Sequence, residues 1–280
     1  MIRGCIFDLG GTLVDKYSLI PKISLKDAFY LKHIIVPKIP LQKYMGMNKL
    51  EHIGKILEDE ITINQWKIKH GRIPNEEDKL EIYDYFNKYM FTNKNKYMEI
   101  IPQTHKCLKY LKDKNIKIGI TTGFSEPLMN CIITSFDLEQ YIDSKVSSTC
   151  LGLPGRPEPH MIEYNMKNMG INNPKSILKI DDTSVGIQEG INAKCLTVGV
   201  SRWSTNMNIE TIEESNLMNK LNEINSFKDY YNYNILNEKI VKSTETLKNS
   251  EADYVIRTLG DLPKIIENIN NNKLFNEYYS

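Results

Sequence analysis

The stretch Cys5-Ile6-Phe7-Asp8-Leu9-Gly10-Gly11-Thr12-Leu13-Val14-Asp15 decides the fold. The short, mostly apolar run from Ile2 to Phe7 predicts a buried strand, and this strand stops at Asp8. Two glycines and Thr12 follow, which favour a tight turn whose backbone N–H groups can approach an anion. Because open α/β sheets bind ligands at the carboxyl ends of their strands, we expect Asp8 to face a phosphate site.

Composition narrows the class of protein. The chain has 280 residues and a hydrophobic fraction of 41%, enough for one large domain or for a core with an inserted cap. Its 36 Lys and Arg residues nearly balance 35 Asp and Glu residues, so we expect no nucleic-acid or membrane partner. No apolar run is long enough for a membrane span. Cys5 and Cys195 fall in apolar runs and are expected to be buried free thiols, which favours a cytoplasmic location.

Strands and helices alternate along most of the chain. Further strands are predicted near residues 116–120, 144–148, 177–181, 195–200 and 252–256. Helices are predicted near residues 103–112, 126–135, 160–169, 185–192 and 262–269. Such alternation predicts a doubly wound parallel sheet, an α/β fold of Rossmann-like form. The polar region from Trp203 to Glu251 reads as helical and carries no chemical motif.

The region between the first two strands has a different pattern. Its predicted segments are all helical and cover Lys26–His33, Leu41–Leu57, Ile63–His70 and Glu76–Tyr89. We therefore expect an α/β core made of residues 1–17 and 96–280, with residues 18–95 inserted as a helical cap. The alternative is one continuous α/β domain with long loops.

Four polar positions could form one site. Asp8 and Asp182 both follow strands, and carboxylates placed together in this way suit Mg²⁺. Thr122 also ends a strand, and Gly123 follows it. Arg156 lies before Pro157 in a stiff loop and offers a guanidinium to an anion. Each residue taken alone could simply cap a helix or form a turn.

Together these positions resemble the ordered motifs of the haloacid-dehalogenase-like phosphotransferases. The matching segments are Asp8-Leu9-Gly10-Gly11-Thr12, Thr122-Gly123, Arg156 and Asp181-Asp182. The resemblance implies that Asp8 is a nucleophile that becomes phosphorylated. It implies Mg²⁺ held by Asp8, the Gly10 carbonyl and Asp182, with Asp181 left open as a ligand. It also implies that phosphate is bound by Gly11, Thr12, Thr122, Gly123 and Arg156.

Position 10 departs from the phosphatases of this superfamily. They carry there an aspartate that protonates the leaving group, whereas this chain has Gly10. Without that acid, an ester phosphatase would lose a contribution of about 10²–10⁴-fold in rate. Either the protein is a poor phosphatase, or its leaving group departs by another route.

The cap segment from Met45 to Ile53 offers such a route. It reads as helical, and at about 100° per residue Lys49 falls inside an apolar arc that His52 borders. A lysine on an apolar face usually extends its ammonium group to solvent. If it is buried instead, its pKa falls and the free amine can attack a carbonyl.

The Met45, Lys49 and His52 segment resembles the Schiff-base segment of the phosphonoacetaldehyde hydrolases, and most of the chain shares the similarity. The resemblance implies a small phosphonate substrate, an imine on Lys49, and His52 and Met45 shaping the site or assisting proton movement. It also implies homodimers joined through the caps. Members of that family commonly have an aromatic residue with a hydroxyl group directly after the segment matching Thr122-Gly123, whereas this chain has Phe124. A small-ester phosphatase and a non-catalytic phosphonate- or phosphate-binding relative stay open as alternatives.

Overall fold

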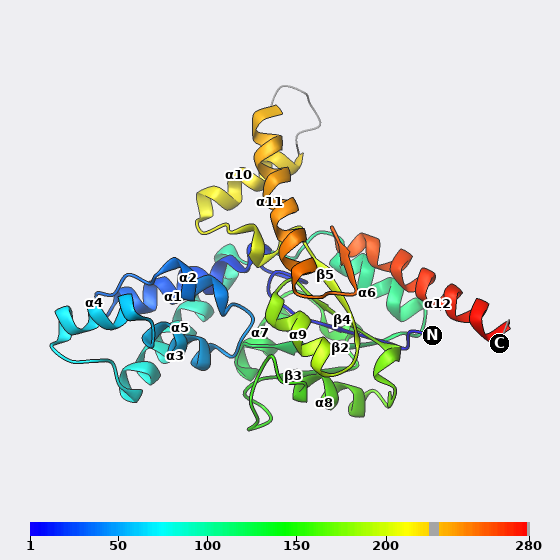
Figure 1. The fold of residues 1–280 in the computed structure, drawn as a ribbon, viewed down its shortest axis with the longest axis horizontal. Helices are drawn as coiled ribbons and strands as arrows, with labels where there is room; N and C mark the ends of the chain where they lie inside the picture. Colours follow the sequence, from blue (N-terminus) through cyan, green and yellow to red (C-terminus); the bar gives the residue numbers. More distant parts are fainter. Residues whose placement is uncertain (224–229, 279–280) are drawn as a thin grey trace.

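A six-stranded parallel sheet forms the centre of the molecule. The computed structural model describes residues 1–223 and 230–278. The strands are β1 (Gly4–Phe7), β2 (Lys117–Thr122), β3 (Ser144–Ser147), β4 (Ile177–Asp181), β5 (Leu196–Val200) and β6 (Tyr254–Ile256). Their order is β3-β2-β1-β4-β5-β6, so β1 lies between β2 and β4 (Figure 1). The predicted doubly wound α/β fold is confirmed.

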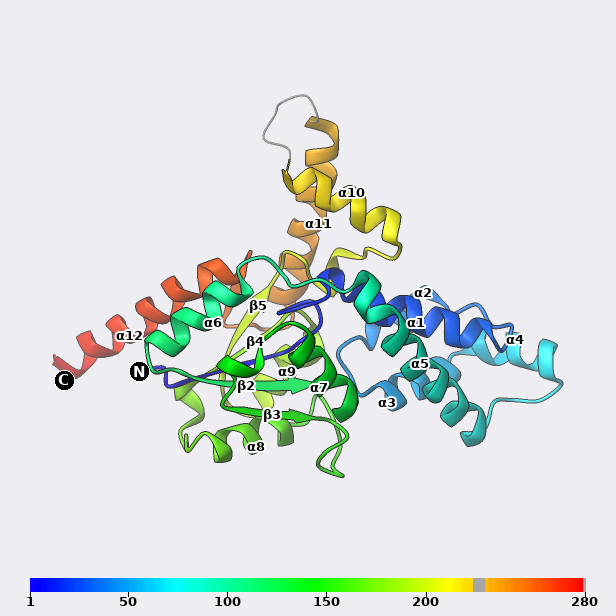
Figure 2. The same ribbon diagram turned by 180° about the vertical axis from the view of Figure 1, so that it is seen from behind.

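Helices cover both faces of this sheet, as the front and back views show (Figures 1 and 2). They are α6 (Thr104–Asp113), α7 (Glu126–Ser135), α8 (His160–Asn168), α9 (Ser184–Asn192) and α12 (Leu262–Tyr278). Successive strand residues point to opposite faces. Accordingly, Ile6 packs in a cluster with Ile162 of α8, whereas Cys5 and Phe7 pack in a cluster with Leu108 of α6. Cys5 and Cys195 are buried free thiols, as predicted.

A group of five helices lies beside the carboxyl ends of the strands. These helices are α1 (Leu19–Tyr30), α2 (Lys38–Lys43), α3 (Lys49–Leu57), α4 (Glu60–His70) and α5 (Glu76–Tyr97). Phe29, Trp66 and Phe86 are buried among them. The predicted cap boundaries at residues 18 and 95 stay a prediction.

The chain enters and leaves this helical group through two adjacent connections. Asp15, Tyr17 and Ser18 of the first connection have positive φ angles of 58°, 67° and 45°. The Lys16 ammonium pairs with a Glu99 carboxylate oxygen of the second connection at 2.8 Å. The two connections are therefore tied to each other next to the sheet.

The prediction of one helix over Leu41–Leu57 is wrong. Residues 44–48 separate α2 from α3, and Met45 lies in this connection rather than on a helix. Gly46 has a φ of 93°, and a Cβ there would lie 2.7 Å from the Thr183 hydroxyl. Asn48 caps α3 by accepting hydrogen bonds from the backbone of Leu50 and Glu51. The close approach of the core at Gly46 explains the break.

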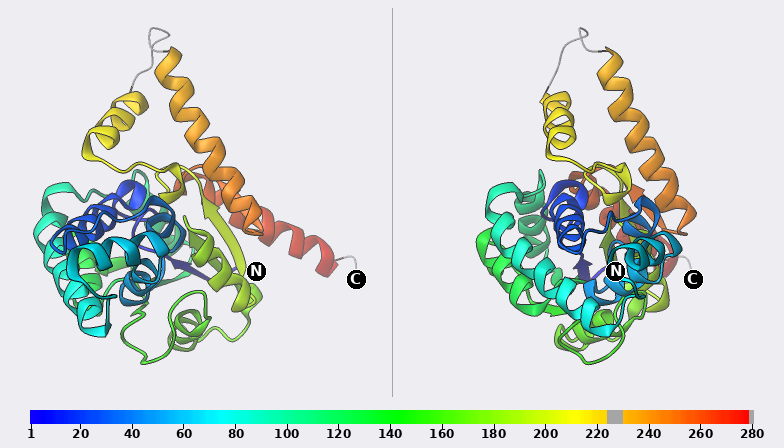
Figure 3. Two further views of the ribbon diagram at one scale, coloured as in Figure 1. Left: turned by 60° about the vertical axis from the view of Figure 1, so that its left-hand side comes forward. Right: turned by 90° about the vertical axis from the view of Figure 1, so that its left-hand side faces the viewer.

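The region after Trp203 forms an arm that projects from the sheet (Figure 3). It contains α10 (Ile212–Glu223) and α11 (Tyr230–Asn249), and residues 224–229 lie outside the described residues. Short 3-10 turns complete the described elements: Lys16–Ser18, Glu139–Tyr141, Pro174–Ser176, Thr205–Met207 and Leu259–Asp261. Within residues 1–223 and 230–278, no helix is long and apolar enough to cross a membrane.

Candidate active site

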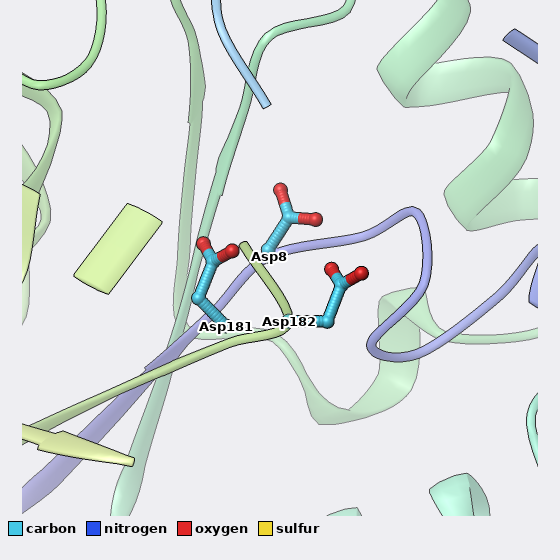
Figure 4. Close-up of side chains that lie close together, drawn as sticks. All are labelled: Asp8, Asp181 and Asp182. Atoms are coloured by element: carbon cyan, nitrogen blue, oxygen red, sulfur yellow. The ribbon is translucent and has the colours of Figure 1, made fainter. Parts of the chain in front are cut away.

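Three carboxylates meet at the centre of the sheet edge. Asp8 directly follows β1, Asp181 ends β4, and Asp182 follows it. The pairing of Phe7 with Ile180 places the ends of these strands side by side. One oxygen from each carboxylate lies within 4.8 Å of the other two, and the three side chains face a common space (Figure 4). This oxygen donor set suits a hard divalent cation such as Mg²⁺.

Burial makes the ionised forms of Asp8 and Asp182 unfavourable unless additional positive charge lies beside them. It raises the pKa of Asp8 to about 6, and the Arg156 guanidinium only partly opposes the rise. Burial also raises the pKa of Asp182 to about 8, and the charges of Asp181 and Asp8 add to the rise. A bound divalent cation would stabilise the ionised forms of these carboxylates. The electrostatics therefore fit a metal site.

The turn after β1 packs tightly against Asp182. Gly11 has a φ of 81°, and a Cβ there would lie 2.3 Å from an Asp182 carboxylate oxygen. The Thr12 hydroxyl donates to Asp182 Oδ1 at 3.2 Å. The backbone N–H of Thr205 donates to Asp182 Oδ2 at 2.6 Å. Gly11 and Thr12 thus hold Asp182 in this structure, in addition to the phosphate role that their motif predicts.

Asp181 has different surroundings. Its Oδ1 accepts hydrogen bonds from the Thr183 N–H at 2.9 Å and hydroxyl at 2.7 Å, and its Oδ2 lies 3.0 Å from Lys179 Nζ. Although burial opposes it, the charges of Lys179 and Arg156 hold the pKa of Asp181 below its usual range. Among the three carboxylates, Asp181 is the one that pairs with two cations, Lys179 at 3.0 Å and Arg156 at 3.5 Å.

The Arg156 guanidinium is fully buried and aimed at Asp8. Its Nη1 lies 2.8 Å from Asp8 Oδ1, and its Nε lies 2.8 Å from Glu189 Oε2. Its Nη2 donates to the Thr121 carbonyl at 2.8 Å and hydroxyl at 2.7 Å. Lys179 Nζ reaches the same Glu189 oxygen at 3.1 Å. Glu189 therefore fixes the direction of Arg156.

Sequence reasoning assigned no role to Lys179 and Glu189. Both side chains are fully buried, on β4 and α9 respectively. Lys179 stands out in the sequence because it interrupts the apolar run of its strand, and this was the one available signal. Its partners come from other elements, which the sequence pattern does not reveal.

A cavity of about 300 Å³, counting the open space at its mouth, lies between Asp8 and the helical group. Seven of the predicted residues line it: Asp8, Gly10, Met45, Lys49, Thr122, Gly123 and Arg156. A Cβ at Gly123 would lie 2.2 Å from the Met47 carbonyl oxygen, so glycine permits the core and the helical group to touch there. A Cβ at Gly10 would meet Phe124 and Ser18 at an ordinary 3.5 Å. Space therefore does not explain the glycine at position 10.

Lys49 is the first residue of α3 and does not extend to solvent, since only 4% of it is exposed. Its Nζ donates to the Met47 carbonyl at 3.3 Å and lies 5.9 Å from the centre of the Phe124 ring. Burial lowers the pKa of Lys49 to about 8, while the charge of Asp8 opposes the change. A useful fraction of this side chain is therefore a neutral amine near neutral pH.

His52 is placed away from the cavity lining. It is fully buried one turn after Lys49, and its Nε2 lies 3.1 Å from the Pro40 carbonyl oxygen. Burial and the charge of Lys49 lower the pKa of His52 to about 3. The ring is therefore neutral, and it must carry its proton on Nε2 to donate to that carbonyl. In this structure it ties α3 to α2, and its predicted help in proton movement stays a prediction.

Asp8 at the end of its strand, Arg156 beside it and Lys49 in the same cavity make up the candidate active site of an α/β core. The family model of haloacid dehalogenase-like hydrolases matches residues 5–200. The chain belongs to this family of enzymes.

Individual proteins resemble the chain over nearly its whole length. It is 29% identical over 269 residues to a phosphonoacetaldehyde hydrolase of Bacteroides fragilis, covering 96% of this chain and 97% of that protein. It is 29% identical over 265 residues to a phosphonoacetaldehyde hydrolase of Latilactobacillus sakei, covering 95% of each. A solved phosphonoacetaldehyde hydrolase-like protein from Oleispira antarctica superposes with a TM-score of 0.81 at 26% identity, covering 96% of this chain and 93% of that one.

Proposed function

We propose that the protein hydrolyses the carbon–phosphorus bond of phosphonoacetaldehyde to acetaldehyde and phosphate. The observation that carries the proposal is the shared cavity of Asp8 and Lys49, in which the lysine is buried and has a lowered pKa. The similarity to phosphonoacetaldehyde hydrolases supports the same substrate. We also propose that residues 18–95 act as a cap that brings Lys49 over Asp8.

The first step uses the neutral amine of Lys49. Its nitrogen adds to the aldehyde carbon of the substrate, and uptake of one proton with loss of water gives a protonated imine. This cation lies one carbon away from the carbon–phosphorus bond. It can therefore accept the electron pair of that bond as an enamine, which makes an acid at position 10 unnecessary.

The second step uses Asp8. A carboxylate oxygen attacks phosphorus, the carbon–phosphorus bond breaks toward the enamine, and the phosphoryl group is left on Asp8. Arg156, which lies 2.8 Å from Asp8, is placed to stabilise negative charge on the phosphoryl oxygens. Proton uptake on carbon and addition of water release acetaldehyde and restore Lys49. A second water cleaves the aspartyl phosphate.

We propose that Asp8, the Gly10 carbonyl and Asp182 hold Mg²⁺, and that Gly11, Thr12, Thr122 and Gly123 help bind the phosphoryl group. When bound, the cation supplies positive charge that stabilises the phosphoryl oxygens. Hydrogen bonds from Thr12 and Thr205 hold the two carboxylate oxygens of Asp182 and so set the orientation of this side chain. Arg156 pairs with Oδ1 of Asp8 and so orients that carboxylate.

Borohydride trapping tests this proposal. The protein is mixed with phosphonoacetaldehyde and Mg²⁺ and reduced, and the modified peptide is located by mass spectrometry. We expect a secondary amine on Lys49 and loss of activity in parallel. Free phosphate without any adduct would contradict the imine and favour the ester phosphatase. If the protein forms neither free phosphate nor an adduct, the proposed activity is wrong.

The rate of trapping should depend on pH through Lys49. Only the neutral amine attacks the aldehyde, and burial lowers the pKa of Lys49 to about 8. Raising the pH from 7 to 9 should therefore increase the initial rate about tenfold, with the rise levelling off above pH 9. The measurement is the amount of reduced adduct at short times. A rate that continues to climb steeply through pH 10 would indicate an ordinary, solvated lysine.

We propose that two copies associate through their caps. The Gln65 side chain of α4 bonds the backbone of Ile35, and Ile61 and Ile68 lie one turn to either side of it. Ile35, Ile61 and Ile68 are all exposed, and exposed apolar patches commonly mark protein interfaces. We expect a dimer by sedimentation, and a monomer for Ile68→Glu. The matched control is Leu217→Glu on the arm, which should stay dimeric; a dimeric Ile68→Glu variant would contradict this interface.

A further inference from the structure

Lys22 is a buried cation that the proposed chemistry does not use. It lies on α1 of the helical group and has no exposed surface. A buried ammonium group needs partners to offset the loss of water. Its Nζ donates to the Thr205 carbonyl at 3.3 Å and to the Ile209 carbonyl at 3.1 Å. Both carbonyls belong to residues 204–210, a segment after β5 that we call the strap.

The strap also holds the candidate metal ligand Asp182. The Thr205 N–H donates to Asp182 Oδ2 at 2.6 Å. The Ser204 hydroxyl and the Asn206 amide each donate to the Asp182 carbonyl at 2.9 Å. The strap therefore forms hydrogen bonds with both the side-chain carboxylate and the backbone carbonyl of Asp182. Thr205 accepts from Lys22 through its carbonyl and donates to Asp182 through its N–H, so it links the two residues.

Other contacts between the strap and the helical group lie nearer the surface. Glu210 pairs with Lys26 of α1 at 3.0 Å and with Lys38 of α2 at 2.8 Å. The side chains of these lysines are 34% and 64% exposed, so solvent screens their pairs. Lys22 is fully buried and contacts the residue that itself holds Asp182. It is therefore the strap contact best placed to affect the metal ligand.

We infer that Lys22 is a positioning residue: by holding Thr205 it orients Asp182 Oδ2 for the metal, and so links the metal ligand to the first helix of the cap. This inference rests on the proposed Mg²⁺ site. Removing the ammonium group takes away the Lys22 bond to each of two buried carbonyls, of which Thr205 keeps the Asn208 N–H as a donor at 3.2 Å. A shift of the strap toward new partners for these carbonyls then moves the Thr205 N–H away from Asp182. The charge of Lys22 has the opposite effect, because loss of a nearby cation alone would strengthen Mg²⁺ binding. Weaker Mg²⁺ binding after removal of the ammonium group therefore indicates a positioning role, whereas tighter binding indicates only the loss of a nearby positive charge.

The test is a calorimetric titration of Mg²⁺ into the full chain without substrate. Lys22→Met keeps the apolar stem, and we expect it to weaken Mg²⁺ binding about tenfold, the scale for partners that orient a metal ligand. The matched control is Lys26→Met, one turn further along α1, which should change the affinity by less than about twofold. Unchanged or tighter binding in Lys22→Met would overturn the inference. If the unsubstituted protein binds no Mg²⁺, the proposed metal site itself fails.

A second variant keeps the test decisive if Lys22→Met does not fold. Asn206 is only partly buried, so Asn206→Ala removes one bond from the strap to Asp182 with little effect on packing. We expect this variant to fold and to bind Mg²⁺ more weakly than the unsubstituted protein does. If its affinity is unchanged, the strap does not position Asp182 and the inference is wrong.

Discussion

Replacing Lys49 with arginine should reduce hydrolysis of phosphonoacetaldehyde about 10⁴-fold or more, the scale for loss of a covalent catalytic group. Arginine keeps the positive charge beside Asp8, so a role limited to binding an anionic substrate would survive the change. It cannot supply a neutral amine, because its guanidinium stays protonated at every accessible pH. The measurement is release of acetaldehyde and phosphate under saturating substrate, together with borohydride trapping. We expect no adduct at position 49.

The control for this variant lies on the same helix. Lys55 is exposed and pairs with Glu58 at 2.8 Å, so Lys55→Arg makes the same chemical change outside the cavity. We expect it to retain full activity and full trapping at Lys49. If Lys49→Arg kept more than a tenth of the activity, the imine mechanism would be wrong and the ester phosphatase would become the better account. Turnover of a simple phosphate ester, measured on both variants, distinguishes these two functions.

The core of the site could be predicted from the sequence because its residues follow strands. In a parallel sheet, the carboxyl ends of the strands share one edge, so Asp8, Thr122 and Asp182 could be placed near one another because each of them ends a predicted strand. Lys49 could be singled out because a charged residue inside an apolar helical arc is unusual. The structure agrees with that arc: Ile53, Ile56 and Leu57 are buried beside Lys49.

Features that depend on contacts between distant segments could not be predicted. The break before α3 depends on Gly46 meeting Thr183 of the core, whereas the local sequence there is compatible with a helix. Lys22 looks like an ordinary polar residue in the sequence because its buried partners belong to the distant strap, and the Glu189 partner of Lys179 likewise comes from another element. His52 shows the same limit: its place on the helix was foreseen, but its bond to Pro40 was not.

Replacing Asp8 with asparagine should abolish turnover and yet leave the imine intact. The amide has nearly the shape of the carboxylate but is a far weaker nucleophile, so we expect a loss of about 10⁴-fold or more in phosphate release. Lys49 keeps its cavity and should still react with the aldehyde. Borohydride should then give an adduct that retains the phosphonate group, because the carbon–phosphorus bond is not broken. Mass spectrometry of the peptide containing Lys49 makes this measurement.

The same variant also tests the electrostatic link between the two residues. The charge of Asp8 raises the pKa of Lys49, so its removal should lower that pKa and shift trapping toward lower pH. The matched control is Asp113→Asn, where the aspartate pairs with Lys109 on the exposed side of α6, and its pH profile should not move. An adduct from Asp8→Asn that has lost its phosphonate would show that another group attacks phosphorus. We expect Asp8→Asn to be trapped fully, to release no phosphate, and to have a pH profile of trapping that is shifted to lower pH. These results together assign the nucleophile to Asp8 and the imine to Lys49.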